Sequence, residues 1–154
     1  MGVAPGRPIL TTERLGVNVL DLTSPDNEGN QPDGQPVVQG GPAAYMTTIP
    51  VKAIVKRMRE AGIPCTVSYS AGTHTCNQIL YWMLHYVQTR KLATRVGYIH
   101  LPDIPAQIAE VYEMTLGSYR PSMPLELMVQ GLEIAIQASL EHPVDIRMGC
   151  GAIC

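Results

Sequence analysis

Three side chains in this sequence, Cys76, His100 and Glu13, have the types that nucleophilic chemistry requires. Cys76 lies in the stretch SAGTHTCN, after a Gly-Thr turn and at the predicted start of a helix. His100 ends a predicted strand, and Glu13 lies just before another in TTER. A cysteine can attack a carbonyl carbon, a histidine can move the proton, and a carboxylate can orient the imidazole and stabilise its cation. We therefore take these residues as candidates for one nucleophilic site.

The position of Cys76 in the first turn of the helix favours an ionised sulfur. Unpaired N–H groups and the positive end of the helix dipole stabilise a thiolate there. The same N–H groups could form an oxyanion hole, and Thr73 and Thr75 are the expected caps of the helix. The alternative is that Cys76 is a small apolar residue of the core.

Each of the other two candidates also has a structural interpretation. His100 precedes a Leu-Pro pair at the end of a strand, where a histidine can be structural or solvated. Glu13 on its own would be a surface charge or a partner in capping by a neighbouring threonine. His85, inside a helix, and His142, after the last helix, are predicted to be non-catalytic.

Composition and charge are those of an ordinary globular chain. Of the 154 residues 45% are hydrophobic and 16% charged, so we expect one domain over 1–154. The net charge of −2 gives no basis for binding nucleic acid or an anionic membrane. No apolar run approaches the ~20 residues that span a bilayer, and no signal-peptide pattern opens the chain. A cytoplasmic protein is therefore expected.

The cysteine pattern predicts neither a metal centre nor a redox pair. No two cysteines have CxxC spacing and none match a zinc motif, so no metal is expected and a generic thiol redox protein is disfavoured. Thiols in the Gly-rich tail GCGAIC are expected to be incidental. The four cysteines are Cys65, Cys76, Cys150 and Cys154.

Helical and extended stretches alternate along the chain. The expected elements are a loop over 1–13, a strand over 14–22, a long loop over 23–42 with a turn at 32–34, a helix over 47–61, a strand over 63–69, a helix over 76–89, a strand over 95–100, a short helix over 105–114, a loop over 119–123 and a helix over 124–141. This alternation predicts an α/β fold with a parallel or mixed sheet and helices on both faces. Sites in such folds form at the carboxyl ends of the strands.

Capping residues and apolar spacing add detail to the helices. Thr47 or Thr48 is expected to cap the helix over 47–61, and Gly62 to end it. The expected buried face of the helix over 76–89 comprises Ile79, Leu80, Met83 and Val87. The expected core positions of the last helix are Leu127, Met128, Leu132, Ile134, Ala135 and Ala138.

Several stretches resemble a known family in their order and spacing. They are GVAPGRPILTTERLGVNV at 2–19, PDNEGNQP at 25–32, GGPAAYMTTIPVKAIVKRM at 40–58, AGIPCTVSYSAGTHTCN at 61–77 and GYIHLPDIPAQ at 97–107. The patterns PDNEGNQP and SxSAGTxxCN are specific, whereas the last helix fits more weakly. Over residues 2–116 the chain resembles the pyroglutamyl peptidase I family, also called pyrrolidone-carboxylate peptidases.

Carried over residue by residue, the resemblance implies that Cys76 is the nucleophile, His100 the general base and Glu13 the carboxylate that orients it. The implied reaction removes an N-terminal 5-oxoproline from a peptide through a pyroglutamyl thioester on Cys76. His100 would protonate the departing amine and then activate water. The resemblance implies no metal or organic cofactor. It also implies a single three-layer α/β/α sandwich with a mixed, mostly parallel sheet, assembled as a homo-oligomer that is often a tetramer.

The chain departs from the family pattern in its pocket and at its start. His74 stands where an aromatic residue is usual and Thr75 replaces an aliphatic residue, while Thr23 and Ser24 replace an Arg and an apolar residue. The substrate ring, to which we assign His74, Thr75 and Ser24, would thus meet a more polar wall. The family's N-terminal strand and TGF-x-PFGG-type loop have no match, so we expect an N-terminally truncated fold. The alternative function is a catalytically impaired or vestigial binding protein.

Overall fold

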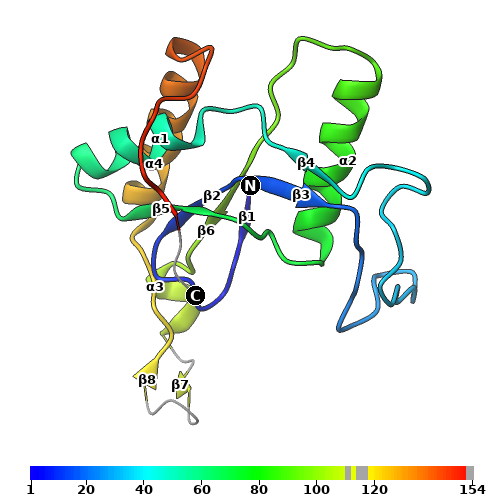
Figure 1. The fold of residues 1–154 in the computed structure, drawn as a ribbon. Coiled ribbons are helices and arrows are strands. Elements are labelled where there is room, and N and C mark those ends of the chain that lie inside the picture. The colour runs from blue at the N-terminus through cyan, green and yellow to red at the C-terminus, as the bar shows by residue number, and fades with distance from the viewer. Residues whose placement is uncertain (110–111, 114–117, 152–154) are drawn as a thin grey trace. The chain divides into compact units, whose positions relative to one another are not determined.

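The computed structural model describes residues 1–109, 112–113 and 118–151 (Figure 1). The chain divides into two compact units. The first comprises Met1–Thr12, Pro50–Val67 and Ile99–Cys154, and the second comprises Glu13–Ile49 and Ser68–Tyr98. Because each unit is built from segments that are distant in sequence, neither corresponds to one continuous half of the chain.

A sheet of four strands in the order β1-β6-β2-β5 lies mostly in the first unit, while Glu13, Ser68 and Tyr98 at the strand ends belong to the second. Its strands are β1 (Gly2–Val3), β2 (Leu10–Glu13), β5 (Cys65–Ser68) and β6 (Tyr98–Leu101). β1 and β6 pair in parallel, with Gly2 opposite His100. With the helices that follow the strands, this sheet confirms the α/β fold class.

The prediction of a loop over 1–13 is wrong, because this region contains β1 and β2. All four residues of Leu10–Glu13 are buried, and the β-branched Thr11 and Thr12 suit a strand. Pro5 and Pro8 both precede β2, so neither of them removes a hydrogen bond from the ladder of this strand. A strand of this length is too short for alternation of apolar and polar residues to reveal it.

Two long helices of the first unit, α1 (Val51–Glu60) and α4 (Leu125–Glu141), pack against each other. α4 also approaches β2 closely, since a Cβ atom on Gly131 would lie 2.6 Å from Cδ1 of Leu10. Three of the six core positions predicted for α4 are buried, which confirms them. The other three are only half-buried, so the predicted core includes too many residues. The buried positions are Met128, Ala135 and Ala138, and the half-buried ones are Leu127, Leu132 and Ile134.

The C-terminal end of α1 confirms the role predicted for Gly62. Gly62 has φ +76, a left-handed conformation that glycine adopts without a steric penalty. Its N–H donates to the carbonyl of Arg59 at 3.0 Å, and the N–H of Ile63 donates to the carbonyl of Met58 at 2.9 Å. These two bonds form a Schellman motif and satisfy carbonyls that the helix end would leave without partners.

The N-terminal end of α1 differs from the prediction, because neither Thr47 nor Thr48 caps it. The carboxylate of Asp145, far along the chain, instead accepts hydrogen bonds from the N–H groups of Lys52 at 3.1 Å and Ala53 at 3.0 Å. A carboxylate at a helix N-terminus satisfies open donors and complements the helix dipole. The segment after α4 therefore secures the start of α1.

The second unit is built from a hairpin-like pair of strands and one long helix. β3 (Leu15–Val17) pairs antiparallel with β4 (Ala44–Met46), with Gly16 opposite Tyr45. The helix α2 (Thr75–Thr89) packs on both strands. A Cβ atom on Gly16 would lie 3.0 Å from Cα of Tyr81, so the glycine permits this close approach. The predicted strand over 14–22 is thus shorter, and beyond it Leu20 forms an isolated antiparallel bridge with Gln35.

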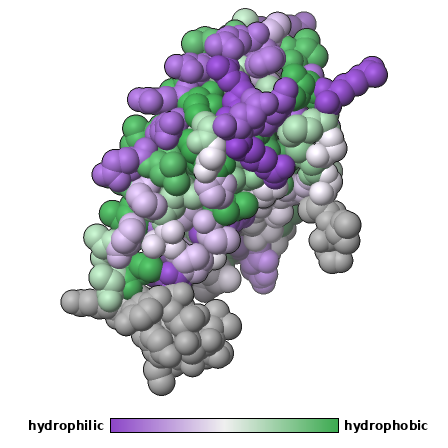
Figure 2. All heavy atoms as spheres, turned by 90° about the vertical axis from the view of Figure 1, so that its left-hand side faces the viewer, coloured by the Kyte–Doolittle hydropathy of each residue, from purple (hydrophilic) through white to green (hydrophobic). Residues whose placement is uncertain are grey.

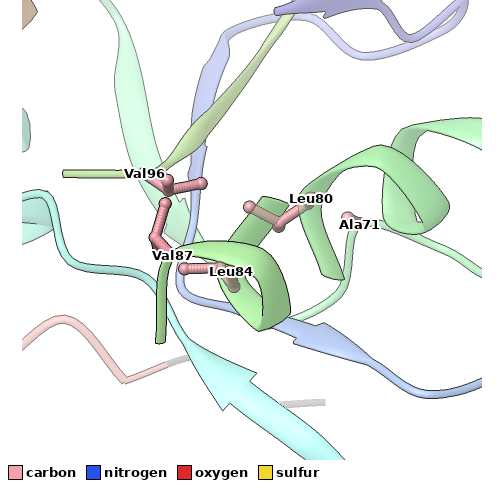
Figure 3. Close-up of a cluster of buried hydrophobic side chains, with 5 residues drawn as sticks. All are labelled: Ala71, Leu80, Leu84, Val87 and Val96. Atoms are coloured by element: carbon pink, nitrogen blue, oxygen red, sulfur yellow. The ribbon is translucent and has the colours of Figure 1, made fainter. Parts of the chain in front are cut away.

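An apolar cluster holds α2 within the second unit (Figure 3). Leu80 and Val87 lie in it as predicted, but Ile79 is half exposed, which contradicts its assignment to the buried face. Tyr81 takes a buried position instead, and its hydroxyl donates to the carbonyl of Pro42 at 2.6 Å. The members of the cluster are Ala71, Leu80, Leu84, Val87 and Val96.

The region after β6 also differs from the prediction. The short helix α3 (Pro105–Ile108) ends well before residue 114. β7 (Tyr112–Glu113), which lies within the predicted helix, pairs antiparallel with β8 (Ser118–Tyr119), whose last residue was expected in a loop. The remainder of the predicted helix, over 110–111 and at 114, lies outside the described residues. Within the described part of the chain, no helix has the length and apolar character needed to cross a membrane.

One face of α4 is exposed and apolar. Leu125, Val129, Ile136 and Leu140 are all exposed, and their spacing of four or seven residues places them on the same side of the helix. The side of the molecule that carries α1 and α4 shows hydrophobic atoms interspersed with hydrophilic ones (Figure 2). These four residues are referred to below as the α4 apolar face.

Cys65 is a buried thiol in β5. Its Sγ lies 3.5 Å from the carbonyl oxygen of Val55, to which it donates. Burial raises the pKa of this thiol from 9.0 to about 11, the charge of Arg59 opposes the shift, and Cys150 adds to it. The thiol therefore keeps its proton in the folded chain at a pH where an unfolded chain loses it.

We predict that the free energy of unfolding falls as the pH rises from about 9 to about 11, because the unfolded chain releases the Cys65 proton first. Below about pH 9 both states hold the proton, so this contribution does not change. Urea unfolding at about pH 8 and about pH 10.5 measures the fall. Cys65→Ala should reduce the fall, and an equal fall in both proteins would contradict the assignment.

Candidate active site

Cys76 is the second residue of α2 and carries a free, half-buried thiol. His74 occupies the cap position, but no side chain caps the helix and no acidic residue lies in its first turn. The open N–H groups and the positive end of the helix dipole therefore act on a sulfur placed there. The predicted position of Cys76 in the first turn is confirmed. A fully buried core thiol, the alternative interpretation, describes Cys65 but not Cys76.

The predicted caps of this helix are wrong. Thr75 is the first helical residue, and the Thr73 hydroxyl donates instead to the carbonyl of Asp21 at 3.2 Å. The N–H of Asp21 in turn donates to the carbonyl of Thr73 at 2.9 Å. This reciprocal pair ties the turn before α2 to the segment after β3, and it uses the hydroxyl that capping would have needed.

Asn77 fixes the start of α2 and was not recognised in the sequence. Its side chain is fully buried and makes three hydrogen bonds to the backbone of Val17, the last residue of β3, and of Val19, two residues further on. The amide oxygen accepts from the N–H of Val17 at 2.8 Å, and the amide nitrogen donates to the carbonyls of Val17 and Val19, both at 2.9 Å. The residue next to Cys76 is therefore held in one position. The sequence signal that could have identified Asn77 was a polar residue that directly follows the cysteine and lies on the buried face of the helix.

Tyr98 is the second residue that sequence reasoning missed. It opens β6, its half-buried ring packs against the apolar cluster of Figure 3, and its hydroxyl forms a hydrogen bond with the Cys76 side chain. Burial raises the pKa of Tyr98, and the hydrogen bond to Cys76 and the charges of Cys76 and Glu13 raise it further. These interactions place Glu13, Cys76 and Tyr98 in one neighbourhood of the second unit.

Glu13 is the last residue of β2 rather than a residue before the first strand. It is fully buried, which contradicts its interpretation as a surface charge. A carboxylate is buried in a protein at a high cost in free energy unless it has partners, so such a group is a strong candidate for a functional role. β2 is the neighbour of β6 in the sheet.

His100 is the third residue of β6 and is buried, with only 3% of its surface exposed. That burial contradicts a solvated strand-end histidine. Tyr98 and His100 are two residues apart in the strand, so their side chains project from the same face of the sheet. His100 belongs to the first unit, and its role toward Cys76 stays a prediction. His85, predicted to be non-catalytic, has Nδ1 2.9 Å from the hydroxyl of Tyr45.

The residues assigned to the substrate ring lie around the start of α2. The Thr23 hydroxyl lies 3.5 Å from Nε2 of His74, which is half-buried, whereas Thr75 and Ser24 are exposed. The segment 21–24 thus lies against the turn that leads into Cys76. Their contact with a substrate ring stays a prediction.

The motif PDNEGNQP forms a closed loop after this segment. The carboxylate of Asp26 accepts hydrogen bonds from the N–H groups of Glu28 at 2.9 Å and Asn30 at 2.8 Å. The bonds from Asn30 are the main cause that lowers the pKa of Asp26. Gly29, with φ +85, supplies the left-handed turn inside the loop. The specificity of the motif in sequence thus has a local structural reason.

A family model described as pyroglutamyl peptidase matches residues 1–142 of the chain. A pyrrolidone-carboxylate peptidase of Brevibacillus brevis is 42% identical over 153 residues, which are 99% of this chain and 68% of that protein. One of Thermococcus kodakarensis is 49% identical over 140 residues, which are 91% of this chain and 65% of that protein. The chain therefore spans about two thirds of the length of these relatives.

The same likeness is found among solved structures. The pyrrolidone carboxyl peptidase from Thermococcus litoralis superposes with a TM-score of 0.91 at 39% identity, covering 96% of this chain and 69% of that chain. A pyrrolidone carboxyl peptidase from Pyrococcus furiosus superposes with a TM-score of 0.85 at 39% identity, covering 92% of this chain and 67% of that chain. This match confirms the α/β fold with a mixed, mostly parallel sheet.

We predict that Asn77→Ala lowers the free energy of unfolding by about 2–4 kcal/mol, because three partly buried hydrogen bonds to the backbone of Val17 and Val19 are lost. Urea unfolding measures the change. Gln78→Ala, an exposed change in the same turn, is the matched control and should have little effect. Equal stability of Asn77→Ala and the unchanged protein would show that the anchor is unimportant.

Proposed function

The chain belongs to the pyroglutamyl peptidase family, and on this basis we propose that it hydrolyses the amide bond after an N-terminal pyroglutamate of a peptide. The observation that carries the proposal is the place of Cys76, in the uncapped first turn of α2 and in a hydrogen bond with Tyr98. Both features stabilise negative charge on sulfur, and the thiolate is the form of cysteine that attacks a carbonyl carbon.

The proposed reaction has two steps. The Cys76 thiolate attacks the pyroglutamyl carbonyl carbon, the C–N bond breaks, and His100 gives a proton to the departing amine. His100 then takes a proton from water, whose oxygen attacks the thioester carbon, and the C–S bond breaks to restore the thiolate. Glu13 orients His100 and stabilises its cation. The burial of Glu13 and His100 supports these roles, since both side chains are shielded from solvent.

The proposed ring contacts are His74, Thr75 and Ser24. They are supported by the packing of segment 21–24 against the turn before α2. The flat imidazole of His74 can stack on a lactam ring, and the hydroxyls can accept or donate hydrogen bonds at its polar edge. The alternative drawn from the sequence, a binding protein without activity, has no support among the described residues.

We also propose that the two compact units form one peptidase domain over 1–154, which the uninterrupted family match over residues 1–142 supports. Self-association, as a tetramer or a smaller homo-oligomer, is supported by the α4 apolar face, since exposed apolar side chains on one side of a helix favour contact with another copy. A cytoplasmic location stays a prediction from the sequence, and cell fractionation would test it.

We predict that Cys76→Ser lowers kcat/KM for a fluorogenic pyroglutamyl amide by at least about 10³-fold, because the nucleophile is lost. His100→Gln should lower it by about 10²–10⁴-fold through the loss of proton transfer. Cys150→Ser, a change in another half-buried thiol, is the matched control and should retain activity. The alanyl amide of the same fluorophore tests the requirement for the ring. Hydrolysis that survives Cys76→Ser would contradict the thiol mechanism.

We predict that Ile136→Glu and Leu140→Glu each raise the dissociation constant of the oligomer by about tenfold or more, because a charge would be buried in an apolar interface. Sedimentation equilibrium measures the association. Gln130→Glu adds the same charge to an exposed polar position of α4 and should leave association unchanged. A monomeric mass for the unchanged protein at all concentrations would contradict self-association.

A further inference from the structure

The hydroxyl of Tyr98 contacts the atom on which the proposed reaction depends. Tyr98 lies outside the trio of Cys76, His100 and Glu13, yet its hydroxyl forms a hydrogen bond with the Cys76 side chain. We propose that Tyr98 is a further catalytic residue, which donates this hydrogen bond to the Cys76 sulfur and stabilises it as a thiolate. The inference rests on the proposed function only in naming Cys76 as the nucleophile.

The direction of the hydrogen bond follows from the surroundings of Tyr98. Burial, the bond to Cys76 and the negative charges of Cys76 and Glu13 all raise the pKa of the phenol. A phenol with a raised pKa holds its proton at neutral pH, so the hydroxyl donates and the sulfur accepts. A hydrogen bond to an ionised acceptor is about twice as strong as one between neutral groups.

Separate contacts hold the two ends of this hydrogen bond. The Tyr98 ring packs against the cluster of Ala71, Leu80, Leu84, Val87 and Val96, and Tyr45 packs against the same cluster. The three hydrogen bonds of Asn77 fix the backbone next to Cys76. The donor is therefore in place before substrate binds, and no reorganisation is needed when the sulfur becomes charged.

The same hydrogen bond affects both chemical steps. When the C–S bond of the thioester forms, the sulfur loses its negative charge and becomes a weak acceptor, so the bond to Tyr98 weakens. When water displaces the sulfur, the charge returns and the bond strengthens, which makes the thiolate a better leaving group. Tyr98 keeps its proton throughout, because His100 carries out the proton transfers.

The test compares Tyr98→Phe with Tyr45→Phe. Each change removes one hydroxyl and keeps the ring that packs on the shared cluster, but the Tyr45 hydroxyl is bonded to His85 rather than to Cys76. The rate of Cys76 alkylation by iodoacetamide is followed over pH. For Tyr98→Phe we expect the pH of half-maximal rate to rise by about one unit, and the rate at neutral pH to fall by up to about tenfold. Tyr45→Phe should match the unchanged protein.

Mass spectrometry must assign the alkylated residue. Trypsin leaves Cys65 and Cys76 in one peptide, because no Lys or Arg lies between Arg59 and Arg90, so fragment ions or cleavage after Tyr69 must separate them. Fluorogenic hydrolysis by the same variants gives a second readout. Tyr98→Phe should lower kcat/KM by about threefold to tenfold at neutral pH and less at alkaline pH, where the thiolate forms without the donor.

The possible outcomes separate this inference from the proposed function. The role of Tyr98 would be overturned if Tyr98→Phe and the unchanged protein gave the same pH profile of Cys76 alkylation, even if pyroglutamyl amides are hydrolysed. An equal shift in Tyr45→Phe would also overturn it, because the effect would then come from packing. A shift confined to Tyr98→Phe supports the hydrogen bond, and it does so even if no pyroglutamyl amide is hydrolysed, since alkylation needs no substrate.

Discussion

The buried amide of Asn77 is the constraint on which the candidate site depends. A helix start is free to fray, and the turn before α2 has no side-chain cap to oppose this. Asn77 replaces such a cap by joining the first turn of α2 to the backbone of Val17 and Val19 through three hydrogen bonds. Because the Asn77 side chain is fully buried, breaking these bonds would leave its amide without partners away from solvent. These bonds also fix the backbone directly beside Cys76.

Several groups near the start of α2 affect the negative charge on the Cys76 sulfur. Burial raises the pKa of Tyr98, and the hydrogen bond to Cys76 and the charges of Cys76 and Glu13 raise it further, so the phenol holds its proton. A neutral donor beside an anionic sulfur lowers the energy of that anion without adding a charge that would need its own partner. The uncapped helix start contributes in the same sense. The dipole of the helix start and one hydroxyl thus both stabilise negative charge on the half-buried sulfur.

The sequence predicted the long helices and the α/β class, but not the short strands or the distant contacts. α2 and α4 have enough turns for apolar spacing to reveal them, whereas β1 and β2 are too short for alternation. The phase of α2 was misjudged because a polar residue, Asn77, lies on its buried face while Ile79 is exposed. Asp145 lies 93 residues from Lys52, and such a cap cannot be inferred from local sequence. The position of Cys76 could be predicted, since a Gly-Thr turn before a periodic helix is a local signal. The contact of Tyr98 with Cys76 required the fold.

The central claim is that the start of α2 and the hydroxyl of Tyr98 stabilise negative charge on the sulfur of Cys76. The ultraviolet absorbance of thiolates, recorded at neutral pH for the unchanged protein and for Cys76→Ser, tests this claim most directly. The account predicts that the substitution removes the absorbance of one thiolate, because the buried Cys65 remains protonated at that pH. Superimposable spectra would contradict it, since they would mean that Cys76 is an ordinary protonated thiol in the resting protein.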